Sequence, residues 1–321
     1  MDLQRMLEKC ESLQWDIDDL DWSMPSKALP KEKEIAVCQY FTDMAGIELL
    51  ASKLFEVQRD QTDDPTLKAI FDSFVVDELR HCEAALRLAK DYDRHHYRRY
   101  ERNKALVRFS HWFHQVVTLV SPEIANAYIT TGELFLDIAL LRSLNDYVND
   151  EMSNAAMELI NRDESRHIAM DYYMVEYYSS PEFAEKDIGL FDRSPKEHAQ
   201  RAYAFAQMML SARPFLRDVF FTPLQLTDPT ARRLKEVFKR VQLIGRKPEV
   251  QARPFPRFAK AMQDLFQHPK YGRYFGPIVV RVIGVDPSVL HNLYSDEEYA
   301  WAMKASLEEM ANEALTAKSL Q

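Results

Sequence analysis

Apolar residues in the first half of the chain recur every three or four positions, which is the period of an amphipathic helix. Between residues 31 and 60 the apolar positions with this spacing are Val37, Phe41, Met44, Ile47, Leu50 and Leu54. The sequence Asp63-Asp64-Pro65 then interrupts the pattern, and a second periodic stretch runs to about Tyr92. Because proline is well tolerated in the first turn of a helix, the pattern predicts two helices joined by a short loop.

Two more core helices are predicted after a crossover. A basic, histidine-rich stretch at 94–104 leads into an apolar segment that ends near Val120. Ser121-Pro122-Glu123 has the composition of a capped helix start, and Asn149-Asp150 interrupts the pattern before it continues to about Tyr178. The chain from 33 to 180 is therefore expected to form four long helices with one crossover segment.

The two ends of the chain carry no chemical motif. Residues 1–32 mix acids with tryptophans and prolines, which predicts a short helix followed by an irregular arm. Beyond 180 the pattern predicts helices near 195–220, 228–244, 255–267 and 296–315. We expect this C-terminal extension, 181–321, to pack on the core and to form a pocket wall or an oligomer contact such as a homodimer interface.

Composition narrows the possible fold classes. Only 7 of the 321 residues are glycine, and the chain is rich in strong helix formers, so the fold class is predicted to be all-α. The net charge of −9 gives no general attraction to nucleic acid or to an anionic membrane. No uninterrupted apolar run approaches the roughly 20 residues of a membrane span, and neither partner is expected.

The cysteines and the N-terminus indicate a cellular location. Cys10, Cys38 and Cys82 are odd in number and lack the spacing of a disulfide framework, so reduced thiols are expected. The first residues lack the apolar region of a signal peptide. Both observations favour a cytoplasmic protein.

Two matching pentapeptides carry the strongest chemical signal. Asp77-Glu78-Leu79-Arg80-His81 and Asp163-Glu164-Ser165-Arg166-His167 both have the pattern Asp-Glu-x-Arg-His. In each, the glutamate and the histidine are three residues apart, which places both side chains on one helical face, a turn apart. One carboxylate and one imidazole per metal suit iron or manganese better than magnesium or calcium.

A lone glutamate stands one helix before each pentapeptide. Glu48 precedes Glu78 by 30 residues (78 − 48), and Glu133 precedes Glu164 by 31 (164 − 133). In an antiparallel pair of long helices, that offset puts the glutamate level with the motif on its neighbour. Surface salt bridges are the alternative interpretation, but acids on apolar faces are costly unless a partner neutralises them.

Other polar and aromatic residues are better explained by packing. His111 and His114 lack an acidic partner at helical spacing, and Cys82 is expected to be buried and inert. The basic stretch at 94–104 has two interpretations, a solvated linker or a docking site for an acidic donor or carrier protein. Ordinary aromatic packing is also preferred to radical chemistry for a group of tyrosines, namely Tyr128, Tyr172, Tyr173, Tyr177 and Tyr178.

The paired motifs resemble the ferritin-like di-iron carboxylate superfamily, in which two helices each give a glutamate and two give Glu-x-x-His. The Asp and Arg within the motif resemble the oxygen-activating branch of bacterial monooxygenase hydroxylases, acyl-carrier-protein desaturases and ribonucleotide reductase small subunits. The resemblance covers about residues 33–179. It implies a ferritin-like four-helix core with additional C-terminal helices.

The resemblance also implies roles for individual residues. Six metal ligands are implied, three for each metal, with Glu78 and Glu164 bridging the two: Glu48, Glu78, His81, Glu133, Glu164 and His167. Asp77 and Asp163 would accept the far ring N–H of a ligating histidine. Arg80 and Arg166 would pair with those aspartates across the bundle.

Two positions depart from the families of this branch. Ala85 stands one turn after His81, where a reductase small subunit carries its radical tyrosine. Asp137 stands one turn after Glu133, where a hydroxylase often has threonine. Asp137 is the predicted catalytic residue, expected to shuttle protons or to cap the site.

The resemblance implies an O₂-dependent oxygenase or oxidase that uses two iron ions, with manganese as the alternative metal. The expected substrate is a small organic molecule that is hydroxylated or N-oxygenated, as in single-component arylamine N-oxygenases. An electron donor of the ferredoxin or reductase type is expected. The alternatives are desaturation of an acyl group bound to a carrier protein, ferritin-type iron oxidation and storage, and a metal-bearing scaffold without catalysis.

Overall fold

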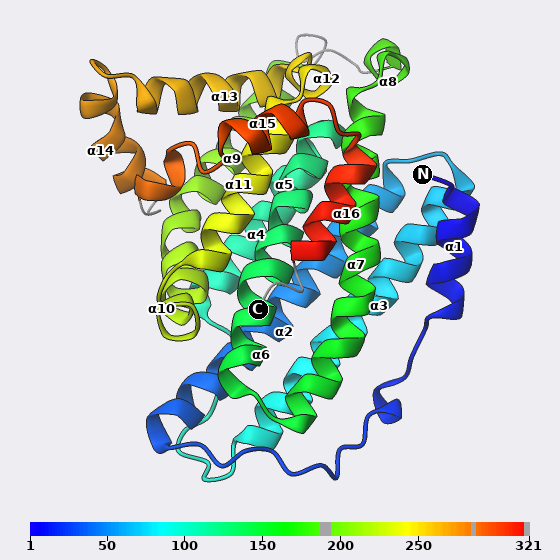
Figure 1. Ribbon diagram of the computed structural model, residues 1–321, viewed down its shortest axis with the longest axis vertical. Coiled ribbons are helices and arrows are strands. Elements are labelled where there is room, and N and C mark those ends of the chain that lie inside the picture. The colour runs from blue at the N-terminus through cyan, green and yellow to red at the C-terminus, as the bar shows by residue number, and fades with distance from the viewer. Residues whose placement is uncertain (187–193, 284–286, 318–321) are drawn as a thin grey trace.

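The computed structural model describes residues 1–186, 194–283 and 287–317, and these residues form helices and loops without a β-strand (Figure 1). The all-α prediction is therefore confirmed for the described part of the chain. Four long helical segments form its centre: α2 (Lys31–Asp60), α3 (Pro65–Tyr92), a composite helix from 122 to 148, and α7 (Glu151–Ser179). α2 packs along α3, and the composite helix packs along α7.

Several ends of these helices follow the predicted signals, but Ser121 makes no side-chain capping hydrogen bond at the start of the composite helix. Pro65 occupies the first turn of α3, and Asp64 accepts hydrogen bonds from the backbone N–H groups of Thr66 and Leu67 at 2.8 and 3.1 Å. Asn149 has a left-handed backbone with φ of 49° and ends the composite helix. Asp150 then accepts from the backbone N–H of Ser153 and begins α7. The predicted break at Asn149-Asp150 is confirmed.

The composite helix changes its winding in the middle. It consists of α5 (Pro122–Leu134), a π-helical segment η2 (Phe135–Leu141) and α6 (Arg142–Val148). By length and composition it could cross a membrane, although Glu133 and Asp137 lie within it and leave no uninterrupted apolar run of that length. Its most apolar window is 72% buried inside the protein, which is the environment of a central core helix.

A second layer covers the four-helix centre (Figure 1). α1 (Leu3–Ser12) packs on α3, and the short η1 (Ile17–Asp19) follows it. These two elements and the irregular chain around them form the N-terminal arm, which precedes α2 and has the predicted short helix. α4 (Lys104–Leu119), in the crossover, packs on α9 (Pro195–Phe215). α11 (Arg232–Arg246) packs on η2, and α16 (Leu307–Ala317) packs on α7.

Shorter elements complete the C-terminal part. They are α8 (Pro181–Lys186), η4 (Leu216–Phe221), α10 (Thr222–Thr227), α12 (Pro248–Gln251), α13 (Pro254–Gln267), α14 (Gly272–Ile283), η5 (Pro287–Leu290) and α15 (Asp296–Ala302). The sequence does not predict α14. The helix predicted over 296–315 is broken, because Ser306 and Glu309 form reciprocal side-chain to backbone hydrogen bonds at 3.1 and 2.7 Å that start α16 anew.

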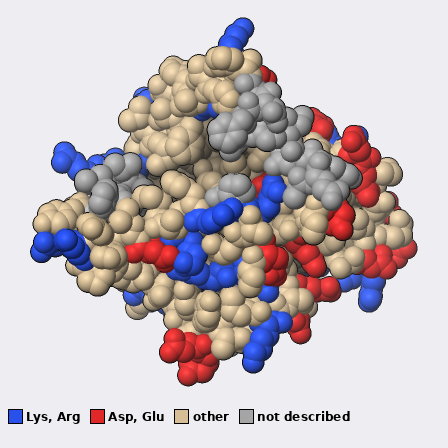
Figure 2. Space-filling model, turned by 90° about the horizontal axis from the view of Figure 1, so that it is seen from above, with Lys and Arg blue, Asp and Glu red and all other residues tan. Residues whose placement is uncertain are grey.

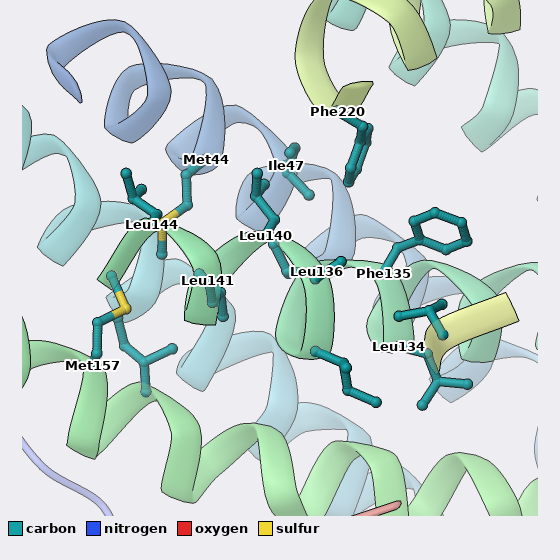
Figure 3. Packing of buried hydrophobic residues seen from close by; sticks show 14 of the residues in the cluster. Met44, Ile47, Leu134, Phe135, Leu136, Leu140, Leu141, Leu144, Met157 and Phe220 are labelled. Atoms are coloured by element: carbon teal, nitrogen blue, oxygen red, sulfur yellow. The ribbon is translucent and has the colours of Figure 1, made fainter. Parts of the chain in front are cut away.

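Buried apolar side chains form two clusters along the four-helix centre. Figure 3 shows the cluster around η2, where Met44 of α2 lies beside Leu144 and Ile47 of α2 lies beside Leu140. The other cluster contains Phe55 of α2 together with Phe71 and Phe74 of α3. On the face that Figure 2 shows, basic and acidic side chains are interspersed with uncharged ones.

Asp150 joins three segments, so its replacement tests how the arm and two core helices are held together. Its carboxylate accepts from the Tyr92 hydroxyl at 2.6 Å and from the backbone N–H groups of Lys27 and Ser153, both at 2.8 Å. Asp150→Ala should lower the free energy of unfolding of the metal-free protein in urea by about 2–3 kcal/mol, because a helix cap and a buried hydrogen bond are lost. Glu151→Ala, at an exposed neighbouring position, is the control; an equal loss in both variants would contradict the assignment.

Candidate metal centre

The six predicted ligands meet inside the four-helix centre, between the two apolar clusters. On each of the four helices, residues of one apolar cluster precede the predicted ligand by about one turn. Residues of the other apolar cluster follow the ligands on the same helix. The six side chains are at most 2% exposed: Glu48, Glu78, His81, Glu133, Glu164 and His167. The sequence therefore predicts correctly that these residues are buried and not on a solvated surface.

The donor atoms fall into two groups that share two residues. Glu48, Glu78, His81 and Glu164 each offer an atom within 4.8 Å of the others. A second group with the same spacing contains Glu78, Glu133, Glu164 and His167. Because Glu78 and Glu164 belong to both groups, they lie where two bridging carboxylates would have to lie.

The distances between ring nitrogens and carboxylates suit shared cations. His81 Nδ1 lies 3.2 Å from Glu164 Oε1 and 3.9 Å from Glu78 Oε2. His167 Nδ1 lies 3.0 Å from Glu78 Oε1 and 3.5 Å from Glu164 Oε2. Ligands bound about 2.1 Å from one metal lie about 3 to 4 Å apart. Each histidine thus stands close to both glutamates that the two groups share.

Helical spacing explains why each motif points inward. Glu78 and His81 lie one turn apart on α3, and both side chains are completely buried. Leu79, directly after Glu78, is 46% exposed because it lies on the outer face of the helix. The corresponding residues of α7, Glu164 and His167, repeat this arrangement.

Each aspartate of one motif contacts the histidine of the other. His81 Nε2 lies 3.2 Å from Asp163 Oδ2, and His167 Nε2 lies 3.4 Å from Asp77 Oδ2. An ionised aspartate only accepts hydrogen bonds, so the Nε2–H of each ring must donate to it. In the neutral ring the lone pair is then on Nδ1, the nitrogen that faces the glutamates.

The two arginines bind these aspartates. Arg166 NH2 donates to Asp77 Oδ2 and to Asp163 Oδ1, both at 2.9 Å. Arg80 NH1 donates to Asp77 Oδ1 at 3.1 Å and lies 3.7 Å from Asp163 Oδ2. Each arginine therefore contacts both aspartates. The predicted ion pairs between helices are present, and each arginine also contacts the aspartate of its own helix.

The N-terminal arm supplies contacts that the sequence does not predict. The Trp15 indole N–H donates to Asp163 Oδ2 at 2.6 Å, and the Trp15 side chain is buried. The Gln14 side-chain amide donates to Asp77 Oδ1 at 3.1 Å. These partners lie 148 and 63 residues away along the chain, and no local motif signals them. The arm thus covers both aspartates from outside the four-helix centre.

Two divalent cations would balance the charges of the site. When ionised, the four buried glutamates carry four negative charges, which two divalent cations would cancel (−4 + 4 = 0). Two aspartates and two arginines cancel each other (−2 + 2 = 0). Buried charge is costly unless it is paired, so this donor set favours cation binding.

Protons neutralise the metal-free site instead. Burial and the nearby Glu164 raise the pKa of Glu48 to about 7. Burial and the neighbouring carboxylates raise the pKa of Glu78 and of Glu133 well above the usual range. Burial opposes ionisation of His81, but the Asp163 and Glu164 carboxylates outweigh it and raise the pKa of this ring to about 10. Metal binding must therefore displace protons from the site.

Opposite charges hold the two aspartates and Glu164 ionised. Burial favours the neutral form of Asp77, but His167 and Arg166 outweigh it and lower the pKa of Asp77 to about 2. His81 likewise lowers the pKa of Asp163 against the effect of burial. Burial is again outweighed at Glu164, where the two histidines lower the pKa of its carboxyl group. The groups that orient the histidines thus stay charged at neutral pH.

Aromatic rings separate one side of the site from solvent. The His167 ring centroid lies 4.2 Å from that of Phe74 and 5.1 Å from that of Phe55. Phe55 and Phe74 are completely buried. A low-dielectric wall of this kind strengthens electrostatic interactions between the cluster and a bound cation.

The predicted catalytic residue does not join either group of donors. Asp137 is completely buried in η2. It interacts electrostatically with Arg142, which lies five residues later in the sequence. Its proposed role in proton transfer stays a prediction. Asp171, one turn after His167, is a further buried acid near the six predicted ligands. It repels the charge of Glu133 and of Glu164. It is 2% exposed, and burial raises its pKa well above the usual range.

The residues expected to serve in packing contribute no atom to either group of donors. The His111 ring contacts the ring of Trp112, and the basic stretch before α4 makes contacts with α2, including His95 with Glu34 at 2.7 Å. Cys82 is half-buried, and burial raises the pKa of its thiol, as expected for an unreactive cysteine. All three cysteines are free thiols.

Metal content provides a direct test of the shared donors. Purified protein should hold about two iron or manganese ions per chain, as the two groups of donors imply. Glu78→Ala or Glu164→Ala should remove both ions, whereas Glu48→Ala or Glu133→Ala should leave about one. Elemental analysis of folded protein measures this.

Glu158→Ala provides the matched control, because Glu158 is an exposed glutamate on the same helix as Glu164. Its metal content should equal that of the unmodified chain. If Glu78→Ala holds as much metal as Glu158→Ala, the six side chains do not form the site.

The contact from the arm yields a separate prediction. Trp15→Phe keeps the aromatic ring over Arg80 but removes the N–H that binds Asp163. Metal affinity, measured by competition with a chelator, should fall about tenfold, since the aspartate loses part of its support. Trp22→Phe removes an indole N–H that binds the backbone of Ile17 instead, and should have no effect. Equal affinities in both variants would contradict a role for Trp15.

Comparison of the chain with protein-family models, with curated protein sequences and with solved structures gives no match. The description of the site as a cluster of buried acids and histidines able to hold metal ions therefore rests on the side chains and their geometry.

Proposed function

We propose that the protein is a di-iron enzyme with a ferritin-like four-helix core, which uses O₂ to oxidise a small organic molecule. The observation that carries the proposal is the sharing of Glu78 and Glu164 between two sets of buried donors, each with one histidine. This is the ligand arrangement of di-iron and di-manganese carboxylate proteins. Two ferrous ions held by these residues would supply electrons together to O₂ for the oxidation of a substrate.

The protein's own side chains would prepare the site for this chemistry. Asp77 and Asp163 fix the orientation of the two histidines, so that Nδ1 of each ring faces the metal positions. Arg80 and Arg166 hold these aspartates, and the arm covers them through Trp15. The rings beside His167 and the complete burial of the glutamates exclude bulk water.

The second helical layer favours an enzyme over an iron store. Oxidation of iron for storage needs no cavity for an organic molecule. Here α11, α12 and α13 lie beside α5 and α7 and line a cavity together with them. Oxidation of a substrate also needs an external source of electrons, and we propose a ferredoxin or reductase for this role. Hydroxylation or N-oxygenation is our preferred reaction, with manganese as the alternative metal.

Exposure of the ferrous protein to O₂ tests the proposal. With excess ferrous iron and no reductant, oxidation should stop after about two ions per chain, because only the bound pair reacts. Absorbance and O₂ consumption measure the extent. His167→Ala should slow the reaction at least about tenfold, whereas Glu158→Ala should react like the unmodified chain.

The same experiment separates the competing functions. Continued oxidation with growth of a ferric mineral would show a storage protein and overturn the proposal. Absence of any O₂ reaction in protein that holds two ions per chain would leave a metal-bearing scaffold. An enzyme should in addition couple O₂ consumption to oxidation of an organic molecule when a reductant is supplied.

A further inference from the structure

A cavity of about 340 Å³ lies between α5 and α7 on one side and α11 to α13 on the other. Its wall is largely apolar and includes the rings of Tyr128, Tyr178 and Phe255 together with Val241 and Val250. Small-molecule pockets usually measure about 300–1,000 Å³ and have mainly apolar walls with a few polar groups. The cavity has the size and the lining of such a pocket.

The cavity begins one helical turn from the candidate metal centre. Thr130 lines it and precedes Glu133 on α5 by three residues, which is about 4.5 Å along a helix axis. On α7, Val175 lines the cavity and follows His167 by eight residues. The buried Asp171 lies between these two residues on α7, one turn from each. The helices α5 and α7, which carry Glu133 and His167, therefore also form part of the cavity wall.

Thr130 provides a buried polar group without a partner. Its side chain is 4% exposed, and Oγ1 makes no hydrogen bond with the described residues. The neighbouring Thr131 differs, because its hydroxyl donates to the backbone carbonyl of Ala127 at 2.7 Å. A buried hydroxyl without a partner is unfavourable, so Thr130 is a natural contact for a polar group on a ligand.

Arg253 and Glu123 form a buried ion pair in the cavity wall, and the two charges neutralise each other. Arg253 donates to Glu123 Oε2 from Nε at 2.8 Å and from NH2 at 2.6 Å. Both side chains are about 10% exposed. Since each charge has its partner within the wall, the inner cavity favours an apolar molecule over an ion.

We propose that this cavity binds the substrate, a largely apolar organic molecule whose one hydrogen-bonding group reaches Thr130. The bound molecule would approach the metal centre from the side of Glu133. That the ligand is a substrate rests on the proposed function, but binding itself does not depend on iron. The two proposals can therefore fail separately.

Gly245 offers a way to fill the cavity without disturbing its wall. It lines the cavity on α11, and a Cβ added there would meet no atom within 4 Å. Gly245→Leu should therefore place a side chain in the cavity, while both Leu and Ala are better helix formers than Gly. Gly245→Ala is the matched control, since it adds one methyl group and leaves most of the space.

The probe is N-phenyl-1-naphthylamine, an uncharged aromatic fluorophore with one N–H, added to metal-free and to metal-loaded protein. Fluorescence should show saturable binding in both forms. Gly245→Leu should weaken binding at least about tenfold, and Gly245→Ala less than about threefold, with metal content equal to that of the unmodified chain. Absence of saturable binding, or equal affinity for Gly245→Leu and Gly245→Ala, would overturn the proposal.

Thr130→Val tests the polar contact, because valine has nearly the same shape and lacks the hydroxyl. The variant should bind the naphthylamine about five- to tenfold more weakly. Its affinity for 1-benzylnaphthalene, in which a CH₂ group replaces the N–H, should not change. A similar loss for both probes would show that Thr130 only shapes the cavity and would overturn its assigned contact. Saturable probe binding in a protein whose ferrous form does not react with O₂ would contradict the proposed function and leave the cavity as a binding site.

Discussion

The structure depends on neutralising four glutamates that are buried in the middle of a helical bundle. Carboxylates away from water are stable only with a proton, a cation or several hydrogen bonds. In the metal-free protein the two histidines and the raised pKa values of Glu48, Glu78 and Glu133 reduce the buried negative charge. The donor atoms also lie close enough together to share metal ions. Two divalent cations would neutralise the site without protons, because their charge equals that of the four glutamates.

The surrounding fold serves to hold the histidines in one orientation. Asp77 and Asp163 bind the outer ring nitrogens, Arg80 and Arg166 bind the aspartates, and the arm adds Trp15. Apolar clusters on both sides keep water out. The second helical layer then adds a cavity one turn from Glu133, so that the arrangement separates a rigid metal centre from a space for an organic molecule.

The sequence predicts much of this site because helical periodicity is local. The spacing of Glu78 and His81, and the offset of Glu48 from Glu78, follow from the geometry of one helix and one antiparallel pair. Trp15 is not predictable in this way, since its contact with Asp163 spans 148 residues and depends on the path of an irregular arm. Likewise, the π-helical winding of η2 has no clear sequence signal, and Asp137, which lies in this segment, acts electrostatically on Arg142.

The proposed chemistry requires these six side chains to bind two metal ions. Anomalous diffraction at the iron absorption edge, from crystals of iron-loaded protein, would locate these ions. Two peaks are expected between Glu78 and Glu164, about 3.5 to 4 Å apart, with one histidine Nδ1 at each. A single peak, or iron bound elsewhere while this cluster stays free of metal, would show that the six side chains do not form a two-metal centre.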